Sequence, residues 1–139
     1  MAKCRDQVGR QGQSNPFDSR LKRRILRVKR LAKRGDRHDL VILDPPTFSR
    51  SKQSGVFLAK RDYGSLTKAA APLVRNGGML LACCNAAGLS NAKFREEVRR
   101  GIRASGRKIV RSFLAMQPPD FPVTKTEPAY LKVSWLRLD

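Results

Sequence analysis

The sequence predicts an α/β protein in which helices alternate with short apolar strands. Between the strand-like runs, apolar residues recur at the three- and four-residue spacing of an amphipathic helix. Glycine- and proline-rich turns separate these segments, and no internal repeat is present. At 139 residues, the chain is long enough for one domain with one modest core.

The N-terminal part of the chain divides into a polar segment and a basic helix. Residues 1–16 are rich in Gly, Gln and Arg and lack periodicity, so we expect them to be disordered. From Phe17 to Arg34, apolar residues recur at helical spacing and basic residues fill the other faces. Gly35 is a suitable stop for this helix because it can adopt the left-handed conformation. The folded domain is therefore predicted to span residues 17–139.

The first strand carries the most informative motif. Leu40–Leu43 is a short apolar run typical of a buried, central strand of a parallel sheet. Asp44 ends the run, and Pro45 and Pro46 stop it because proline has no N–H for the sheet ladder. Phe48 follows. Ligands of open α/β sheets bind at the carboxyl ends of the strands, although Asp-Pro also begins many loops and the aromatic ring could simply cover the core.

A helix and a second strand follow this loop. The polar residues 49–55 predict a flap, and apolar residues from Tyr63 to Val74 predict a helix. The turn at residues 76–78, Asn-Gly-Gly, leads into a second buried strand at Met79–Cys84.

The remaining elements are a third helix and two strands. Ser90 is a predicted N-cap, and Ser105-Gly106 ends the helix. Residues 108–116 form the third predicted strand. The last strand, residues 130–138, alternates imperfectly, so we expect a half-buried position at the edge of the sheet. The apolar face of the third helix consists of Phe94, Val98 and Ile102.

The charge indicates a polyanionic partner. The chain has 30 Lys and Arg against 11 Asp and Glu, a net charge of +19 and a pI near 11.2. Such a domain is drawn to RNA or DNA, and less commonly to an anionic membrane surface. The basic helix could grip phosphates or form a solvated face. No apolar run approaches the roughly 20 residues of a membrane span, so we expect no membrane partner.

The cysteine and histidine content predicts a reduced, metal-free protein. The three cysteines, Cys4, Cys83 and Cys84, are an odd number, and neighbours on one strand point to opposite faces. No Cys/His group has zinc spacing, and His38 is the only histidine. We expect a cytoplasmic protein. An organelle is the alternative, because the Arg-rich start loosely imitates a transit peptide.

Six motifs together resemble one family, the large-subunit ribosomal RNA methyltransferase I family of class I S-adenosylmethionine-dependent methyltransferases. The resemblance runs from about Leu31 to the end of the chain. It implies a Rossmann-like fold of which this chain has the C-terminal half, strands four to seven, with the last two strands as a hairpin. The motifs occur in the family's order, at residues 39–48, 61–63, 76–78, 83–85, 119–122 and 127–132.

The resemblance implies S-adenosylmethionine as cofactor, yet the expected glycine-rich turn is missing. Class I methyltransferases hold the cofactor mainly through a glycine turn after strand one and an acidic residue after strand two. Gly9 and Gly12 follow no predicted strand, so a flexible linker is the better interpretation of both. The cofactor site is therefore predicted to be incomplete, and no cofactor-binding residue is assigned.

The resemblance also assigns roles at the Asp-Pro-Pro loop. Asp44 and the Pro45 carbonyl are suited to accept hydrogen bonds from a base amino group, and Phe48 could stack on the base. Pro45, Pro46 and Phe48 are the candidate substrate-binding residues, and Asp44 is a candidate catalytic residue.

Cys84 is the second candidate catalytic residue. It lies where the family carries a cysteine that could attack cytosine to allow methylation at carbon 5. Free cysteine is also among the most buried residue types, so a core position is the alternative. Cys83 is expected to face the core. Methylation of an exocyclic adenine nitrogen would need no cysteine, so the base stays open.

These observations predict an RNA methyltransferase acting on ribosomal RNA, in a form that lacks the cofactor glycine loop. The alternatives are a non-catalytic, basic RNA-binding fragment and a truncated chain without independent function. A half-sheet that ends at Leu40–Leu43 would expose a strand edge, so we also expect self-association through that edge.

Overall fold

The computed structural model describes residues 16–46, 59–115, 117–121, 123–126 and 129–139. Three helices, one short 3-10 helix and four strands are present in this part of the chain. In chain order they are α1 (Pro16–Lys33), β1 (His38–Leu43), α2 (Ala59–Ala70), η1 (Ala71–Leu73), β2 (Val74–Cys84), α3 (Asn91–Ala104), β3 (Ile109–Ala115) and β4 (Lys132–Leu138). The disorder predicted for residues 1–16 and the flap predicted at 49–55 fall almost wholly outside the described residues.

The four strands form one mixed sheet in the order β1-β2-β4-β3. β1 and β2 are parallel, whereas β4 is antiparallel to both β2 and β3. The predicted α/β class and the closing hairpin of the last two strands are confirmed. The edge position predicted for the last strand is wrong, because β4 lies between β2 and β3. Lys132 and Ser134 obscured its alternation, since these polar residues occupy inward, buried positions.

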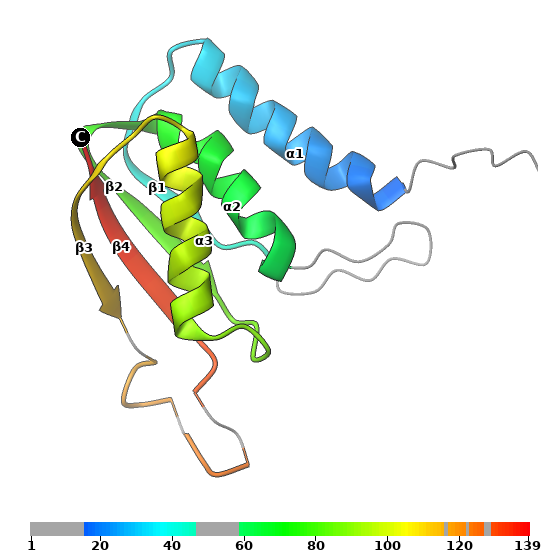
Figure 1. Cartoon of the computed structure of the whole chain (residues 1–139), viewed down its shortest axis with the longest axis vertical. Helices are drawn as coiled ribbons and strands as arrows, with labels where there is room; N and C mark the ends of the chain where they lie inside the picture. The colour runs from blue at the N-terminus through cyan, green and yellow to red at the C-terminus, as the bar shows by residue number, and fades with distance from the viewer. Residues whose placement is uncertain (1–15, 47–58, 116, 122, 127–128) are drawn as a thin grey trace, which may run out of the picture.

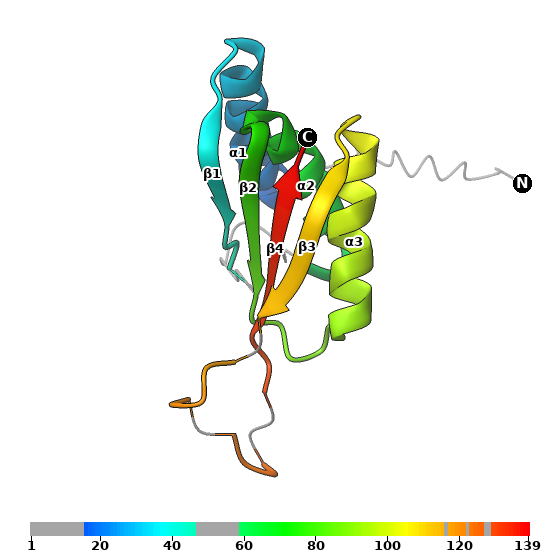
Figure 2. The ribbon, with the colours of Figure 1, turned by 90° about the vertical axis from the view of Figure 1, so that its left-hand side faces the viewer.

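All three helices lie on one face of the sheet (Figures 1 and 2). The core lies between this helical layer and the sheet, and at its centre Tyr63 and Phe94 meet edge to face, with ring centroids 5.0 Å apart. Ile25 and Val28 of α1 pack against the same core. The apolar face predicted for the first helix is therefore confirmed where side chains are described.

The opposite face of the sheet has no covering element among the described residues, as the view in Figure 2 shows. Leu40 and Ile42 are 44% and 58% exposed there. Phe113 pairs with Trp135 across β3 and β4, and their rings stack with centroids 5.8 Å apart. The prediction that Leu40–Leu43 is buried on both faces is wrong for Leu40 and Ile42, because no described element covers their face of the sheet. In the described sheet β1 is an edge strand, as expected for a half-sheet that ends at Leu40–Leu43.

The junction between α2 and β2 differs from the prediction. The helix ends at Ala70, and Val74 already belongs to β2. The predicted turn at residues 76–78 is an irregularity inside the strand: His38 pairs with Val74, but Leu40 pairs with Met79. Gly77 has a φ of 76°, which only glycine adopts without strain.

The predicted stop of the first helix at Gly35 and the predicted N-cap of the third helix at Ser90 are confirmed. Gly35 has a φ of 85° immediately after α1. At the start of α3, the Ser90 hydroxyl accepts a hydrogen bond from the Lys93 N–H at 3.3 Å. That bond satisfies one of the amide groups left free at a helix N-terminus.

Two glycines bring α2 and α3 into backbone contact. A Cβ on Gly101 would lie 2.5 Å from the Gly64 carbonyl oxygen and 2.7 Å from the Thr67 Cβ. A Cβ on Gly64 would lie 2.9 Å from a carboxylate oxygen of Glu97. Gly101 therefore cannot hold a larger residue unless the helices separate, whereas at Gly64 the closest atoms are the ends of side chains that can move.

Within the described residues, no helix is long and apolar enough to cross a membrane.

Candidate functional site

The candidate site lies at the carboxyl ends of β1 and β2. These strands are parallel, and Leu43 pairs with Ala82 at the end of the ladder. Asp44 therefore leaves β1 beside Cys83, at the edge where α/β sheets bind ligands. The Asp44 side chain is exposed, Pro45 is half-buried and Pro46 is exposed. Phe48, the fourth residue predicted to meet the base, lies outside the described residues.

Tyr63 of α2 joins the two strand ends. Its hydroxyl lies 3.0 Å from the Leu43 carbonyl oxygen and 2.8 Å from the Cys83 carbonyl oxygen. The phenol has one proton to donate, so the two carbonyls share it. Tyr63 is fully buried. The backbone that presents Asp44 is thus held against β2 from inside the core.

The phenol also lies within electrostatic reach of the site's acidic groups. Burial raises the pKa of Tyr63 far above its usual value of 10.0, and Cys84, Cys83 and Asp44 raise it further. Tyr63 is therefore a hydrogen-bond donor at all physiological pH values. It is not a candidate base.

The two cysteines lie on opposite faces of β2, as their adjacency predicts. Cys84 is 2% exposed and belongs to the core under the helices, whereas Cys83 is half-buried on the uncovered face. The expectation that Cys83 faces the core is wrong. Burial raises the pKa of the Cys83 thiol, and Asp44 and Cys84 add to this effect, so Cys83 is a protonated thiol at neutral pH.

Lys132 is a buried cation opposite Cys84. The two residues pair across β2 and β4, and Lys132 is 5% exposed. Its ammonium donates to the Ala86 carbonyl at 2.9 Å and to the Tyr130 carbonyl at 2.6 Å. Burial lowers the pKa of Lys132, and the nearby Cys84 opposes that shift. Lys132 thereby ties the loop after β2 to the start of β4.

The structure thus brings together Asp44, Pro45 and Pro46 on the outside and Tyr63, Cys84 and Lys132 beneath them. Sequence reasoning missed the roles of Tyr63 and Lys132. The sequence did contain a signal for both roles. Tyr63 lies in the apolar face of a predicted helix and Lys132 lies in a predicted strand, and a buried tyrosine or lysine must find a polar partner.

The described residues do not fit a complete S-adenosylmethionine site. One helix, α1, precedes β1, so no strand–glycine–helix turn is present in the described part of the chain. The cradle for the methionine group and the acid for the ribose are both missing from it. Only the carboxyl end of β1 matches one wall of such a site. The same residues contain no group of three potential metal ligands.

The sequence profile of a protein family, described as S-adenosylmethionine-dependent methyltransferase, matches residues 2–137. The chain belongs to this family. A ribosomal RNA large subunit methyltransferase of Deinococcus radiodurans is 34% identical over 107 residues, which are 76% of this chain and 26% of the relative. Ribosomal RNA large subunit methyltransferase K/L of Methylococcus capsulatus is 48% identical over 50 residues, 35% of this chain and 7% of the relative.

Solved structures agree with the methyltransferase fold. The structure of SMU.776 complexed with SAH matches with a TM-score of 0.65 and 26% identity, over 80% of this chain and 29% of that one. A SAM-dependent methyltransferase of Agrobacterium tumefaciens, at 15% identity, shares the fold with a TM-score of 0.58, over 81% of this chain and 37% of that one. The chain spans about a quarter of the length of the Deinococcus relative and of SMU.776.

Proposed function

We propose that this chain is the base-binding part of an S-adenosylmethionine-dependent methyltransferase that modifies ribosomal RNA. The observation that carries the proposal is the exposed Asp44-Pro45 pair at the carboxyl end of β1, held against β2 by the buried Tyr63. The family supports the reaction class, and the names of the relatives support ribosomal RNA as substrate. The net charge of +19 favours a polyanionic substrate.

In this proposal, Asp44 is the group that meets the base. An exposed carboxylate and the neighbouring Pro45 carbonyl can accept hydrogen bonds from an exocyclic amino group and orient its nitrogen. Pro46 stiffens the turn that presents them, and Phe48 would stack on the ring of an unstacked base.

Cys84 has a role only if cytosine carbon 5 is the target. A thiolate would then have to attack the neighbouring ring carbon. At 2% exposure, Cys84 is closed to a base in this structure, whereas Asp44 is open. This difference favours an exocyclic nitrogen over carbon 5 as the methylated atom.

The first test measures cofactor and RNA binding separately. Isothermal titration with S-adenosylmethionine reports the cofactor, and anisotropy of a labelled ribosomal RNA fragment reports the RNA. Binding of both, followed by transfer of a radioactive methyl group to the RNA, is the expected result for a functional site. RNA binding without cofactor binding would instead indicate the second candidate function, a basic RNA-binding fragment. The absence of a complete cofactor site among the described residues favours this alternative.

Asp44→Asn is the decisive variant for the site itself. It keeps the shape of the side chain but replaces one acceptor oxygen with a donor, so RNA binding should weaken, and methyl transfer, where the cofactor binds, should fall roughly a hundredfold. Glu96→Gln, the same carboxylate-to-amide change at an exposed position of α3 outside the six motifs, is the matched control. Equal activity of the two variants would exclude Asp44 from the reaction. Cys84→Ala, compared with Cys83→Ala, decides between carbon and nitrogen as the target.

We propose two further properties. A ribosomal RNA substrate implies a cytoplasmic location, or an organelle with its own ribosomes. The edge strand β1, with Leu40 and Ile42 exposed, favours self-association. Sedimentation velocity of Ile42→Lys should show fewer oligomers than the parent chain. Leu26→Lys, which places the same charge at an exposed position of α1, should leave the distribution unchanged.

A further inference from the structure

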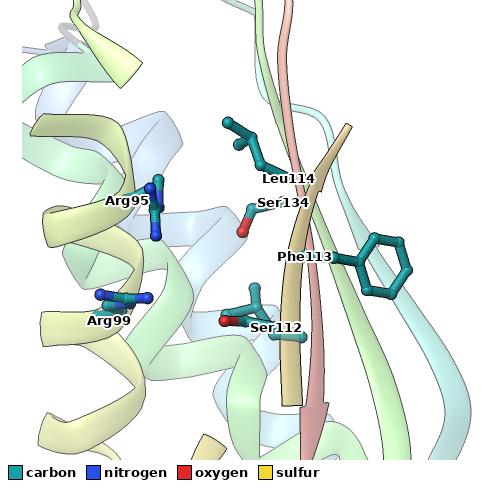
Figure 3. A pocket seen from close by; sticks show the side chains of 7 residues that line it. Arg95, Arg99, Ser112, Phe113, Leu114 and Ser134 are labelled. Atoms are coloured by element: carbon teal, nitrogen blue, oxygen red, sulfur yellow. The ribbon is translucent and has the colours of Figure 1, made fainter. Parts of the chain in front are cut away.

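A small cavity lies between α3 and the β3–β4 hairpin, on the helical side of the sheet. Its volume is about 100 Å³, several times the roughly 10–15 Å³ that one water needs. Arg95 and Arg99 line it from the helix, and Ser112 and Ser134 line it from the strands. Figure 3 shows both serine hydroxyls pointing toward the helix that carries the arginines, while the Phe113 ring points to the opposite face.

The two guanidinium groups converge because of their spacing. Residues four apart in an α-helix lie on the same face, one turn above the other. Neither Arg95 nor Arg99 has an ion pair or hydrogen bond with any described residue. The buried carboxylate of α3, Glu97, points toward α2 and pairs with Arg100. The cavity therefore has two positive charges and no described counterion.

Ser134 provides the second, independent observation. It is 5% exposed, its hydroxyl points into the cavity, and it makes no hydrogen bond with a described residue. A buried hydroxyl without a partner is unfavourable, so such groups in native proteins bind water or a ligand. The remaining wall is apolar, formed by Leu114 and the fully buried Leu136.

We propose that this cavity binds one phosphate group. Planar guanidinium groups offer paired N–H donors that match the oxygens of phosphate, and the two serines can donate to the same group. The volume suits a single tetrahedral oxyanion and excludes a nucleotide. The site lies between α3 and the far hairpin, whereas Asp44 lies at the end of β1. It is therefore separate from the base-binding site.

Two sources can supply this phosphate: the backbone of an RNA or free inorganic phosphate. The RNA source rests on the proposed function, because it would make the cavity an anchor for the strand whose base reaches Asp44. The phosphate site itself does not depend on methyl transfer. Failure of cofactor binding would leave the experiment below unaffected.

The experiment is a titration of the full chain with inorganic phosphate at constant ionic strength. Amide NMR chemical shifts or calorimetry measure the binding. Arg95→Gln combined with Arg99→Gln should weaken binding at least tenfold. The matched control, Lys93→Gln with Arg103→Gln, removes two charges from the same helix at exposed positions outside the cavity and should retain parental binding. Equal loss in both double variants would overturn the site, because general charge attraction would then explain the binding.

Ser134→Ala separates a binding role from a structural one. Without phosphate, the variant should melt at or above the parental temperature, since an unpartnered buried hydroxyl is removed. Its phosphate affinity should nevertheless fall at least threefold. Reduced stability together with unchanged affinity would overturn the assignment of Ser134.

Competition between RNA and inorganic phosphate identifies the source of the bound phosphate group. If a short single-stranded RNA displaces phosphate, the ligand is the RNA backbone, and the arginine double variant should lower the salt dependence of RNA binding by more than the control does. If RNA binds without displacing phosphate, free phosphate is the ligand. Absence of saturable phosphate binding and of any difference between the double variants would overturn the proposal.

Discussion

Replacing Tyr63 with Phe tests how the site is held in place. The change removes one oxygen and keeps the ring, so the edge-to-face contact with Phe94 is preserved. The lost hydroxyl is the shared donor to the Leu43 and Cys83 carbonyls, at 3.0 and 2.8 Å. Tyr63→Phe should therefore weaken the link between the carboxyl ends of β1 and β2.

The magnitude follows from burial and from the number of protons. One hydroxyl proton makes one hydrogen bond's worth of stabilisation, about 1 kcal/mol net, even though two carbonyls share it. Because Tyr63 is fully buried, water cannot easily take the place of its hydroxyl. The Leu43 and Cys83 carbonyls would then lack a hydrogen-bond donor, which adds a penalty of about 1–3 kcal/mol. We expect a total of about 2–4 kcal/mol, a shift of roughly thirtyfold or more in the unfolding equilibrium.

Urea unfolding followed by circular dichroism measures this change directly. Tyr130→Phe is the matched control, since Tyr130 is 37% exposed and its hydroxyl has no partner among the described residues. The control should stay within about 0.5 kcal/mol of the parent. If Tyr63→Phe were equally harmless, the phenol would not join the two strands, and the account of how Asp44 is presented would be wrong.

The pH dependence gives a second readout. The folded pKa of Tyr63 is raised above the unfolded value of 10.0, so above that pH the unfolded phenol loses its proton first. The folded state then holds more protons, and the parent loses stability as the pH rises through 10. Tyr63→Phe lacks this loss. The stability gap between the parent and the variant should therefore narrow above pH 10.

Three further predictions concern the packing and the buried polar groups. Gly101→Ala should destabilise the fold by about 1–3 kcal/mol in a thermal melt, since its Cβ would lie 2.5 Å from the Gly64 carbonyl oxygen. Lys132 has a lowered pKa, so between that value and 10.5 the unfolded state binds more protons; the parent should gain stability relative to Lys132→Met as the pH rises toward 10.5. Iodoacetamide should modify Cys83 slowly at pH 8 and Cys84 only in urea, as mass spectrometry of the single alanine variants can show; rapid native labelling of Cys84 would contradict its closed position.

The sequence predicted the elements better than their boundaries and positions. Periodicity located the three helices and four strands because each helix and most strands have an apolar face. It misplaced β4 because Lys132 and Ser134 point inward, and a pattern of apolar residues cannot show that a buried polar group has found partners. It also predicted Val74 to be helical. Val74 continues the helical spacing of the apolar residues before it and also begins the strand, so the pattern alone does not show where the helix ends.

Part of the candidate site could be predicted and part could not. Asp44 was predictable because an apolar run, a carboxylate and two prolines are adjacent in the chain. Tyr63 contacts Leu43 and Cys83, each of which lies 20 positions away from it in the sequence. Periodicity shows only that Tyr63 faces the core, so these contacts could not be predicted. Arg95 and Arg99 resembled any solvated charge run, because their isolation from carboxylates is a property of three-dimensional packing.

The glycine contact between α2 and α3 links the two proposed sites mechanically. Because Gly101 rests on the Gly64 backbone with no side chain between them, α3 cannot tilt or slide without carrying α2 along. Gly64 is next to Tyr63, and Gly101 is two residues from Arg99. A displacement of α3 at the cavity would therefore press on α2, the helix that carries the phenol beneath Asp44.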